Sequence, residues 1–379
     1  MISFKIRDNQ KKIKICYVID SLSSSGAEKQ LIQLVKNLNT DRFEPTVCCL
    51  SAKRKLNRQS AVISSYINVF EMDNLFSVVG LKEFVRFICL LRKEKFDLIH
   101  SWLFTSDIVG LIGGATARVQ TRISSRRDTG FWKKYHHRLF YNIILNRLTS
   151  HFIPNAAESK SRLMNEENVS EKRITTIVNG VDLEELTPGS KKKQRTNFPV
   201  IGIMASLTEV KGHVYLFEAF KKLLKTYPHA ILKIAGTGPL KNELKKYSRK
   251  NGIWDQVLFV GFVDDIVSFY NSLDLLISSS LSEATSNSIL EGMACGLHVI
   301  ATNVGDNPKI IKHGETGYLC EPADSVDLYE KMFQSIQDME AGKMNGKRAR
   351  DFIVDNYSMM RMVNETEKIY LKELNRNLS

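Results

Sequence analysis

The sequence predicts an α/β protein built of two doubly wound, Rossmann-like domains. Its 379 residues exceed the size at which one hydrophobic core usually keeps growing, so two domains are expected. Short apolar runs alternate with longer segments of helical periodicity, which is typical of a parallel sheet covered on both faces. A polar, turn-rich and charged stretch at residues 186–193 interrupts this alternation, which then begins again.

Each half contains its own series of predicted strands. In the first half they are residues 13–19, 46–50, 67–70, 97–101, 121–124, 150–153 and 174–178. In the second half they are residues 200–205, 230–235, 257–260, 274–278, 298–301 and 317–319. The predicted domains are therefore residues 1–188 and 189–358. Residues 359–379 contain a last helix that is expected to pack back on the first domain.

One intervening helix illustrates the periodicity on which these predictions depend. Its apolar residues share one face at helical spacing and comprise Leu81, Phe84, Val85, Ile88 and Leu91. In open sheets of this kind, ligands bind beyond the carboxyl ends of the strands. With two such domains in one chain, we expect the active site to lie between them.

The composition is that of a folded, water-soluble protein, with 43% hydrophobic and 25% charged residues. This excludes disordered, collagen-like and disulfide-scaffold classes. The six cysteines form no CxxC pair and mostly occupy apolar runs, which predicts small buried side chains in a reducing compartment. The first 14 residues lack the apolar stretch of a signal peptide, and residues 98–119 include His100 and Asp107, which makes them a poor spanning helix. A cytoplasmic location is expected.

The positive charge is concentrated in the first half. Residues 1–188 hold 29 Lys and Arg against 19 Asp and Glu, and so carry +10 of the net charge of +13. Such a field favours anionic partners, which include nucleic acid, anionic lipid and phosphorylated substrates, without choosing among them.

The segment that carries most chemistry is residues 278–296. An apolar strand leads into a small polar loop, and a helix is expected to begin near Asn287 or Ser288. A helix start offers backbone N–H groups and the positive end of a dipole to an anion such as a diphosphate. Glu283 precedes this helix and Glu291 lies about one turn inside it, so the two carboxylates can address different parts of one ligand.

This segment resembles the signature of the retaining glycosyltransferases of family four, which have the GT-B fold and include the group 1 enzymes of bacterial polysaccharide and glycolipid assembly. The resemblance rests on Glu283, Glu291, the small residues 293–296 and the strand 299–302. It implies that Glu283 contacts the donor sugar and that Glu291 holds the ribose hydroxyls of a nucleotide diphosphate sugar. Either glutamate alone would be read as a surface residue at a helix start.

Other segments of the second half match the same family. Lys211 resembles the lysine that neutralises the donor pyrophosphate, and Ser206 stands where an arginine is usual. Gly236 and Gly238 resemble a loop near the nucleotide, where glycines let the backbone approach the ligand. Phe262 lies in a string that flanks the base. The helix start contributes Ser286, Asn287 and Ser288 to the predicted donor site, and residues 179–182 are expected to form a tight turn.

Two residues of the first half complete the predicted site. Gly26 follows the first strand and resembles the family's small-residue loop beneath the transferred sugar and phosphate. His100 ends another strand where the family often carries a histidine, but Trp102 occupies the position of the usual second one. His100 is therefore either catalytic or structural.

A basic segment distinguishes the first half. Residues 118–147 contain eight Lys and Arg against one acid, with five aromatic residues interleaved among residues 131–141. Such a helix can lie on an anionic membrane surface or bind a lipid-linked pyrophosphate. We expect Arg126, Arg127, Lys133 and Lys134 to form an acceptor and membrane face. The alternative is a solvated helix whose aromatic residues pack in the first core.

These observations favour an enzyme that transfers a hexosyl or N-acetylhexosaminyl group from a nucleotide diphosphate sugar to a lipid-linked or glycan acceptor, with retention, in cell-surface polysaccharide biosynthesis. Lys211 and the helix amides would stabilise the departing diphosphate without a metal or other cofactor. Peripheral attachment to the inner face of the cytoplasmic membrane is expected, and nucleic acid is not expected as a partner. Two alternatives stay open: a basic nucleic-acid-binding protein, although no motif of that class is found, and a catalytically inactive glycosyltransferase-like subunit.

Overall fold

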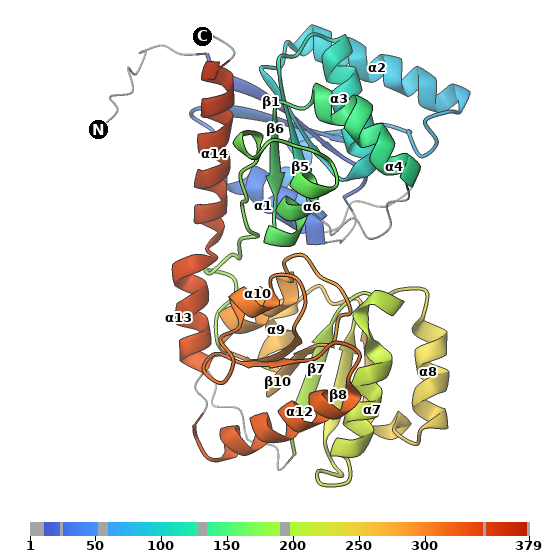
Figure 1. The fold of residues 1–379 in the computed structure, drawn as a ribbon, viewed down its shortest axis with the longest axis vertical. Coiled ribbons are helices and arrows are strands. Elements are labelled where there is room, and N and C mark those ends of the chain that lie inside the picture. Colours follow the sequence, from blue (N-terminus) through green and yellow to red (C-terminus); the bar gives the residue numbers. More distant parts are fainter. Residues whose placement is uncertain are drawn as a thin grey trace. The chain divides into compact units, whose positions relative to one another are not determined.

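Two parallel sheets, one in each of two structural units, organise the chain. The computed structural model describes residues 11–22, 26–51, 60–127, 135–189, 198–343 and 346–376 (Figure 1). Unit 1 comprises Met1–Asn155, Ser159–Ile177 and Met362–Ser379, and unit 2 comprises Ala156–Glu158 and Val178–Arg361. Each unit contains a six-stranded sheet with flanking helices. The predicted α/β class with two doubly wound domains is confirmed.

The sheet of unit 1 has the strand order β3-β2-β1-β4-β5-β6, and all of its strands are parallel. The strands are β1 (Ile13–Ile19), β2 (Phe43–Cys49), β3 (Ile67–Val69), β4 (Leu98–Trp102), β5 (Thr121–Arg126) and β6 (His151–Pro154). The helices between them are α1 (Gly26–Asn37), η1 (Ser60–Tyr66), α2 (Val78–Glu94), α3 (Phe104–Thr116), α4 (Tyr135–Phe140), η2 (Tyr141–Leu145) and α5 (Asn146–Leu148). After β6 come α6 (Ala157–Asn165) and η3 (Glu171–Arg173).

The predicted strand at residues 174–178 is wrong. This segment runs beside β6, where the N–H groups of Thr175 and Ile177 donate to the carbonyls of Phe152 and Pro154. Only Phe152 and Ile174 form a bridge, which is isolated, so no ladder develops. The apolar run is explained instead by the burial of Ile174 and Ile177 beside β6.

The face of α2 that the periodicity predicts to be apolar is only partly buried. Leu91 of this face is buried, and Phe84 packs against the core of unit 1. Gly80, Phe87 and Leu91 are the buried residues of this helix. Leu81 and Val85 are 56% and 59% exposed. The helix therefore contacts the core of unit 1 through a narrow stripe, and a second group of apolar residues faces solvent.

The last helix, α14 (Met359–Arg376), belongs to unit 1 from Met362 onward. Met362, Val363 and Tyr370 are buried, and the N–H of Asn39 donates to Oε1 of Glu367 at 2.8 Å. The expected return of the C-terminal helix to the first domain is confirmed.

Unit 2 repeats the parallel architecture with the strand order β12-β11-β10-β7-β8-β9. Its strands are β7 (Val200–Met204), β8 (Ile231–Ala235), β9 (Val257–Gly261), β10 (Leu275–Ser278), β11 (His298–Thr302) and β12 (Tyr318–Cys320). Its helices are η4 (Glu209–Lys211), α7 (His213–Leu223), α8 (Lys241–Lys250), η5 (Trp254–Gln256), α9 (Ile266–Asn271), α10 (Asn287–Ala294), α11 (Asn307–Ile310), α12 (Ser325–Glu340) and α13 (Gly346–Asn356).

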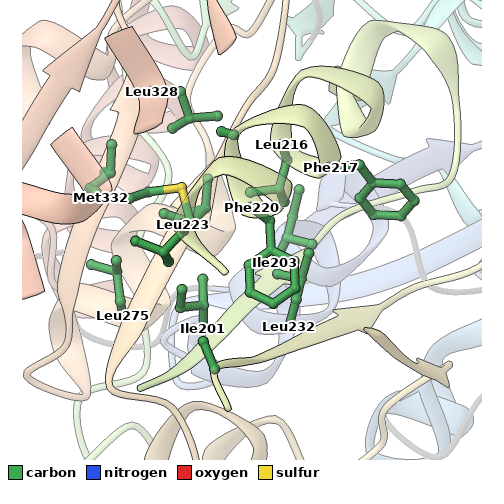
Figure 2. Packing of buried hydrophobic residues seen from close by; sticks show 14 of the residues in the cluster. Ile201, Ile203, Leu216, Phe217, Phe220, Leu223, Leu232, Leu275, Leu328 and Met332 are labelled. Atoms are coloured by element: carbon green, nitrogen blue, oxygen red, sulfur yellow. The ribbon is translucent and has the colours of Figure 1, made fainter. Parts of the chain in front are cut away.

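The core on one face of this second sheet is formed by α7 and α12. Figure 2 shows Phe220 and Leu223 of α7 beside Ile201 of β7, with Met332 of α12 close to them. All four are at most 1% exposed. Since near-continuous apolar strands buried on both faces are typical of parallel sheets, this packing explains why β7, β8 and β10 are easily recognised in the sequence.

The division of the chain differs from the predicted one at two points. Residues 178–188 lie with unit 2, because the N–H of Val181 donates to the carbonyl of Tyr357 and its carbonyl accepts from Met359. Unit 2 ends at Arg361 rather than at residue 358. No helix among the described residues is long and apolar enough to cross a membrane. The six cysteines are free, and all but Cys89 are buried.

Candidate donor site

The loop after β10 brings Glu283 to Lys211. The Lys211 ammonium lies 2.5 Å from Oε1 of Glu283, and the hydroxyl of Ser280 donates to the same oxygen at 2.9 Å. The two side chains keep 21% and 13% of their surface exposed. They are separated by 72 residues in the sequence, so the fold joins two residues that sequence analysis had assigned to different parts of one ligand.

The position of Lys211 depends on close packing between two loops. Gly212 follows η4 with φ of 62°, and a Cβ there would lie 2.1 Å from the carbonyl oxygen of Ser279. The hydroxyl of Ser279 donates to the Lys211 carbonyl at 2.9 Å, and the N–H of Leu281 donates to the carbonyl of Val210 at 2.7 Å. Residues 210–212 and residues 279–281 are thus joined by hydrogen bonds, and only glycine fits at position 212.

His213 begins α7 directly after this glycine and was not singled out from the sequence. It is 2% exposed, and neither ring nitrogen has a hydrogen-bond partner in the described part of the chain. Burial, together with the Lys211 charge, lowers the pKa of His213 to about 4. The ring is therefore neutral at pH 7, and it adds no second positive charge beside Lys211.

The start of α10 is anchored by Asn179. Its side-chain amide donates to Oδ1 of Asn287 at 2.7 Å and to the carbonyl of Thr285 at 3.4 Å. Residue 179 was expected to serve a tight turn; the structure places it against the loop that opens α10. Ser286 is the N-cap residue, and its hydroxyl lies 3.2 Å from that of Ser288 without capping the helix. Ser286 is buried and Ser288 is half-buried at the helix start, and their contact with a donor stays a prediction.

Glu291 is held by a residue that the sequence analysis missed. The buried Tyr270 hydroxyl donates to Oε2 of Glu291 at 2.7 Å. Burial and the neighbouring Glu291 raise the pKa of Tyr270 well above its usual value, and burial with the same carboxylate raises the pKa of Cys295 to about 12. Glu291 is 8% exposed. Its carboxylate is thus oriented by one phenol.

Replacing Tyr270 by phenylalanine tests this positioning role. We expect the KM for the sugar donor to rise about tenfold, because a hydrogen bond to a charged group is worth about 1.5–3 kcal/mol, while kcat changes little. Steady-state kinetics separate the two parameters. Tyr247→Phe is the matched control, since its hydroxyl donates to Glu218 at 3.0 Å on the exposed side of the same unit. A lower kcat with unchanged KM would contradict the assignment.

Gly236 and Gly238, which are predicted to lie near the nucleotide, each pack closely against a backbone carbonyl of their own unit. Gly236 has φ of 133°, and a Cβ there would lie 1.9 Å from the carbonyl oxygen of Ala205. At Gly238 a Cβ would lie 2.4 Å from the carbonyl oxygen of Leu207. At both positions a side chain would collide with the loop that follows β7 and contains Ser206, so glycine is needed for this packing. The two glycines shape the site through that loop.

Ser206 and Phe262 lie at the surface of unit 2. Ser206 is exposed, and its hydroxyl lies 3.3 Å from that of Thr208. Phe262 follows β9 and is 50% exposed. Exposed aromatic rings can stack on a nucleotide base, and the role of Phe262 beside the base stays a prediction.

His100 is an interior residue of unit 1. It is fully buried, with Nδ1 at 2.7 Å from the hydroxyl of Tyr370 and Nε2 at 2.8 Å from the hydroxyl of Ser125. Burial, assisted by the charge of Arg127, lowers its pKa. Both ring nitrogens are engaged, so the geometry supports the structural alternative, in which His100 joins β4 to α14. Gly26 is exposed at the start of α1.

The predicted acceptor and membrane face is contradicted at Arg126. This arginine is 6% exposed, lies over the Tyr141 ring at 4.1 Å from its centroid, and forms ion pairs with the buried Asp107 and Glu167. Arg127 lies 4.1 Å from the centroid of Trp102, and burial lowers its pKa to about 9. Arg126 is therefore buried inside unit 1, and Arg127 packs against the buried Trp102 of the same unit. Lys133 and Lys134 lie outside the described residues.

Comparison with known families identifies the class of protein. The family model described as "Glycosyltransferase Family 4" matches residues 24–185, and the model described as "Glycosyl transferases group 1" matches residues 189–352. The chain belongs to these glycosyltransferases and is an enzyme of that class.

Individual relatives support the same assignment along the whole chain. The UDP-Gal:alpha-D-GlcNAc-diphosphoundecaprenol alpha-1,3-galactosyltransferase of Escherichia coli is 24% identical over 97% of this chain and 98% of its own. The capsular polysaccharide biosynthesis glycosyltransferase CapM of Staphylococcus aureus is 22% identical over 95% and 97%. The crystal structure of Anabaena Alr3699/HepE in complex with UDP and glucose has a TM-score of 0.83 at 21% identity, covering 95% of this chain and 100% of that one. The fold is therefore GT-B.

Proposed function

We propose that this glycosyltransferase moves a sugar from a nucleotide diphosphate sugar to a lipid-linked or glycan acceptor in cell-surface polysaccharide biosynthesis, with retention at the anomeric carbon. The observation that carries the proposal is the cluster around β10 and α10. It combines the Lys211–Glu283 pair, the Tyr270–Glu291 pair and a helix start without a side-chain cap. A cation, a helix start and two carboxylates suit the phosphates, the sugar and the ribose of one donor.

In the proposed reaction the donor diphosphate lies between Lys211 and the first amides of α10. Breaking the bond between the anomeric carbon and the phosphate oxygen leaves negative charge on the diphosphate, which the ammonium and the helix dipole stabilise. The acceptor hydroxyl attacks from the same face, and the departing phosphate oxygen takes its proton. Glu291 accepts hydrogen bonds from the ribose hydroxyls, and Glu283 contacts the sugar. No metal or other cofactor is needed in this scheme.

The acceptor side of the proposal draws on the relatives. The E. coli enzyme is named for a diphosphoundecaprenol acceptor and the S. aureus protein for capsular polysaccharide biosynthesis. A polyprenyl diphosphate acceptor resides in a membrane, so the enzyme would work at the cytoplasmic face of that membrane as a peripheral protein. The positive charge of residues 1–188 suits an anionic bilayer.

A panel of UDP-, GDP- and ADP-sugars, tested by thermal unfolding with and without EDTA, examines the donor assignment. At a hundredfold excess over Kd, one nucleotide class is expected to raise the unfolding midpoint by about 5–10 °C, because ligand binding adds about 2.7 kcal/mol. EDTA should not reduce the shift. The absence of stabilisation by every donor would overturn the donor assignment and favour an inactive subunit, whereas a shift abolished by EDTA would overturn the metal-free scheme. The anomeric configuration of the product, measured by NMR, tests retention.

A further inference from the structure

The solvent-facing side of α2 and the turn before it carry an unusual group of apolar side chains. Phe76 is 94% exposed and Val78 is 84% exposed. Val79, Leu81 and Val85 are each more than half exposed. Side chains at positions 78, 81 and 85 recur at helical spacing and thus share one side of the helix. We call these five residues the α2 apolar face.

The turn that presents Phe76 is well defined by hydrogen bonds. The N–H of Phe76 donates to Oδ1 of Asn74 at 3.0 Å, and the Ser77 hydroxyl donates to the Asn74 carbonyl at 2.8 Å. The hydroxyl of Ser77, as N-cap, accepts from the N–H of Gly80 at 3.0 Å. A Cβ at Gly80 would lie 2.1 Å from the Asn74 carbonyl oxygen, so glycine permits this close packing. These hydrogen bonds fix the turn in which Phe76 is exposed to solvent.

The charges around the α2 apolar face are basic. Lys82, Arg86, Arg92 and Lys93 are exposed on the helix. Its two glutamates are half-buried and engaged, Glu83 with Arg86 at 2.8 Å and Glu94 with Lys14 at 3.3 Å.

The acids closest in sequence to the start of α2 are Glu71 and Asp73, both exposed. The hydroxyl of Ser51 donates to Asp73 at 2.6 Å. The helix itself therefore presents apolar residues and cations to solvent, and both of its carboxylates are paired with cations.

We propose that the α2 apolar face docks on an anionic phospholipid bilayer. Apolar side chains flanked by lysine and arginine are the chemistry that inserts into the boundary between headgroups and acyl chains while binding anionic headgroups. Phe76 and Val78 enter the boundary, and Lys82 and Lys93 contact the phosphates. The inference goes beyond the proposed function by naming the surface, and it rests on that function only for the location of the acceptor.

A second copy of this chain is a poorer occupant of the same face. In a two-fold dimer the same patch meets itself, so the four cations of α2 would oppose four like charges. The chain also carries a net charge of +13. An anionic bilayer instead neutralises these charges while it covers the apolar residues.

Co-sedimentation of the full chain with vesicles tests the proposal. Vesicles of phosphatidylglycerol and phosphatidylcholine should bind the chain, pure phosphatidylcholine should bind it far less, and high salt should weaken binding. The double substitution Phe76→Ser and Val85→Ser should lower the partition coefficient about tenfold or more, because it removes apolar surface that would be buried in the bilayer. Lys82→Gln and Lys93→Gln should each lower it about fivefold.

Matched controls lie on unit 2. Val326→Ser with Val354→Ser removes two valines that are 49% and 42% exposed, and Lys246→Gln with Lys250→Gln removes two exposed lysines of α8. Both controls should bind vesicles like the unmodified chain. Unfolding midpoints and donor-induced stabilisation should stay unchanged in every variant, which separates a failure of docking from a failure of the donor site.

Three outcomes would overturn the proposal. The first is the absence of binding to anionic vesicles, and the second is equal loss of binding in the α2 variants and in their controls. The third is a dimer, seen by sedimentation velocity, that the double substitution at Phe76 and Val85 dissociates. That result would make a second copy the occupant of the α2 apolar face.

Discussion

Replacing Lys211 by methionine is expected to lower kcat/KM for sugar transfer about a hundred- to a thousandfold, the range found when one preorganised stabilising group is removed. The close packing of Gly212 against Ser279 fixes the backbone of Lys211. In the proposed reaction its ammonium, which pairs with Glu283 in this structure, stabilises the charge that develops on the diphosphate. Methionine keeps the length of the side chain and removes its charge. Steady-state transfer kinetics with the donor found in the thermal panel give the measurement.

Lys221→Met is the matched control for this substitution. Lys221 is exposed on α7 of the same unit, where its ammonium donates to Oδ1 of Asn251 at 3.2 Å. Its removal should leave kcat/KM within about twofold, because surface charges screened by solvent contribute little. If Lys211→Met retained more than half of the unmodified activity, the diphosphate would have to be stabilised elsewhere.

The sequence predicts the candidate residues of a donor site more readily than the contacts among them. Glu291 and the start of α10 were predicted correctly in position, because a short apolar strand followed by a polar loop and small residues produces a local pattern. The Tyr270–Glu291 and Lys211–Glu283 contacts join residues 21 and 72 positions apart. Tertiary packing decides which residues meet in these two contacts, and a single sequence contains no periodic pattern that reveals such pairs.

The fold was predictable where strands are apolar throughout. β1 was predicted over its full length, whereas β2 begins at Phe43 and was predicted only from residue 46, because Glu44 and Pro45 interrupt the apolar run. Proline is tolerated at position 45 because β3 pairs with β2 only from Val47 to Cys49, so β2 has a partner strand on one side alone at Pro45. The apolar periodicity of α2 predicts its buried side only in part. Leu91 is buried, whereas Leu81 and Val85 are exposed, because buried and exposed apolar residues contribute equally to a periodic pattern.

Charge was the least reliable guide to location. The basic and aromatic composition of residues 118–147 predicts an acceptor and membrane face that includes Arg126. Arg126 instead lies at the centre of a buried network in which Asp107 also accepts hydrogen bonds from Ser124 at 2.8 Å and Tyr141 at 3.1 Å. A buried arginine between two acids is indistinguishable in sequence from an exposed one, since the acids belong to α3 and to the segment after α6.

Replacing Arg126 by alanine is therefore expected to destabilise unit 1 by about 3–5 kcal/mol rather than to weaken membrane binding of the folded protein. Asp107 is fully buried and the side chain of Glu167 is 5% exposed, so both carboxylates would be left without their cation. Chemical denaturation, or a fall of about 10–15 °C in the unfolding midpoint, measures the loss. Arg138→Ala is the control, because its pair with Glu166 at 3.2 Å is exposed and worth about 1 kcal/mol or less.

The pH dependence of that deficit distinguishes a lost charge pair from lost packing. Burial already raises the pKa of Asp107 above its usual value, although Arg126 opposes the shift. Without Arg126 the pKa rises further, so the folded variant binds a proton at a higher pH than its unfolded chain does. A group of this kind favours the folded state increasingly as pH falls. The difference in unfolding free energy between Arg126→Ala and the unmodified protein should therefore be smaller at pH 5 than at pH 7.5. A deficit independent of pH would assign the loss to the packing of Arg126 against Tyr141.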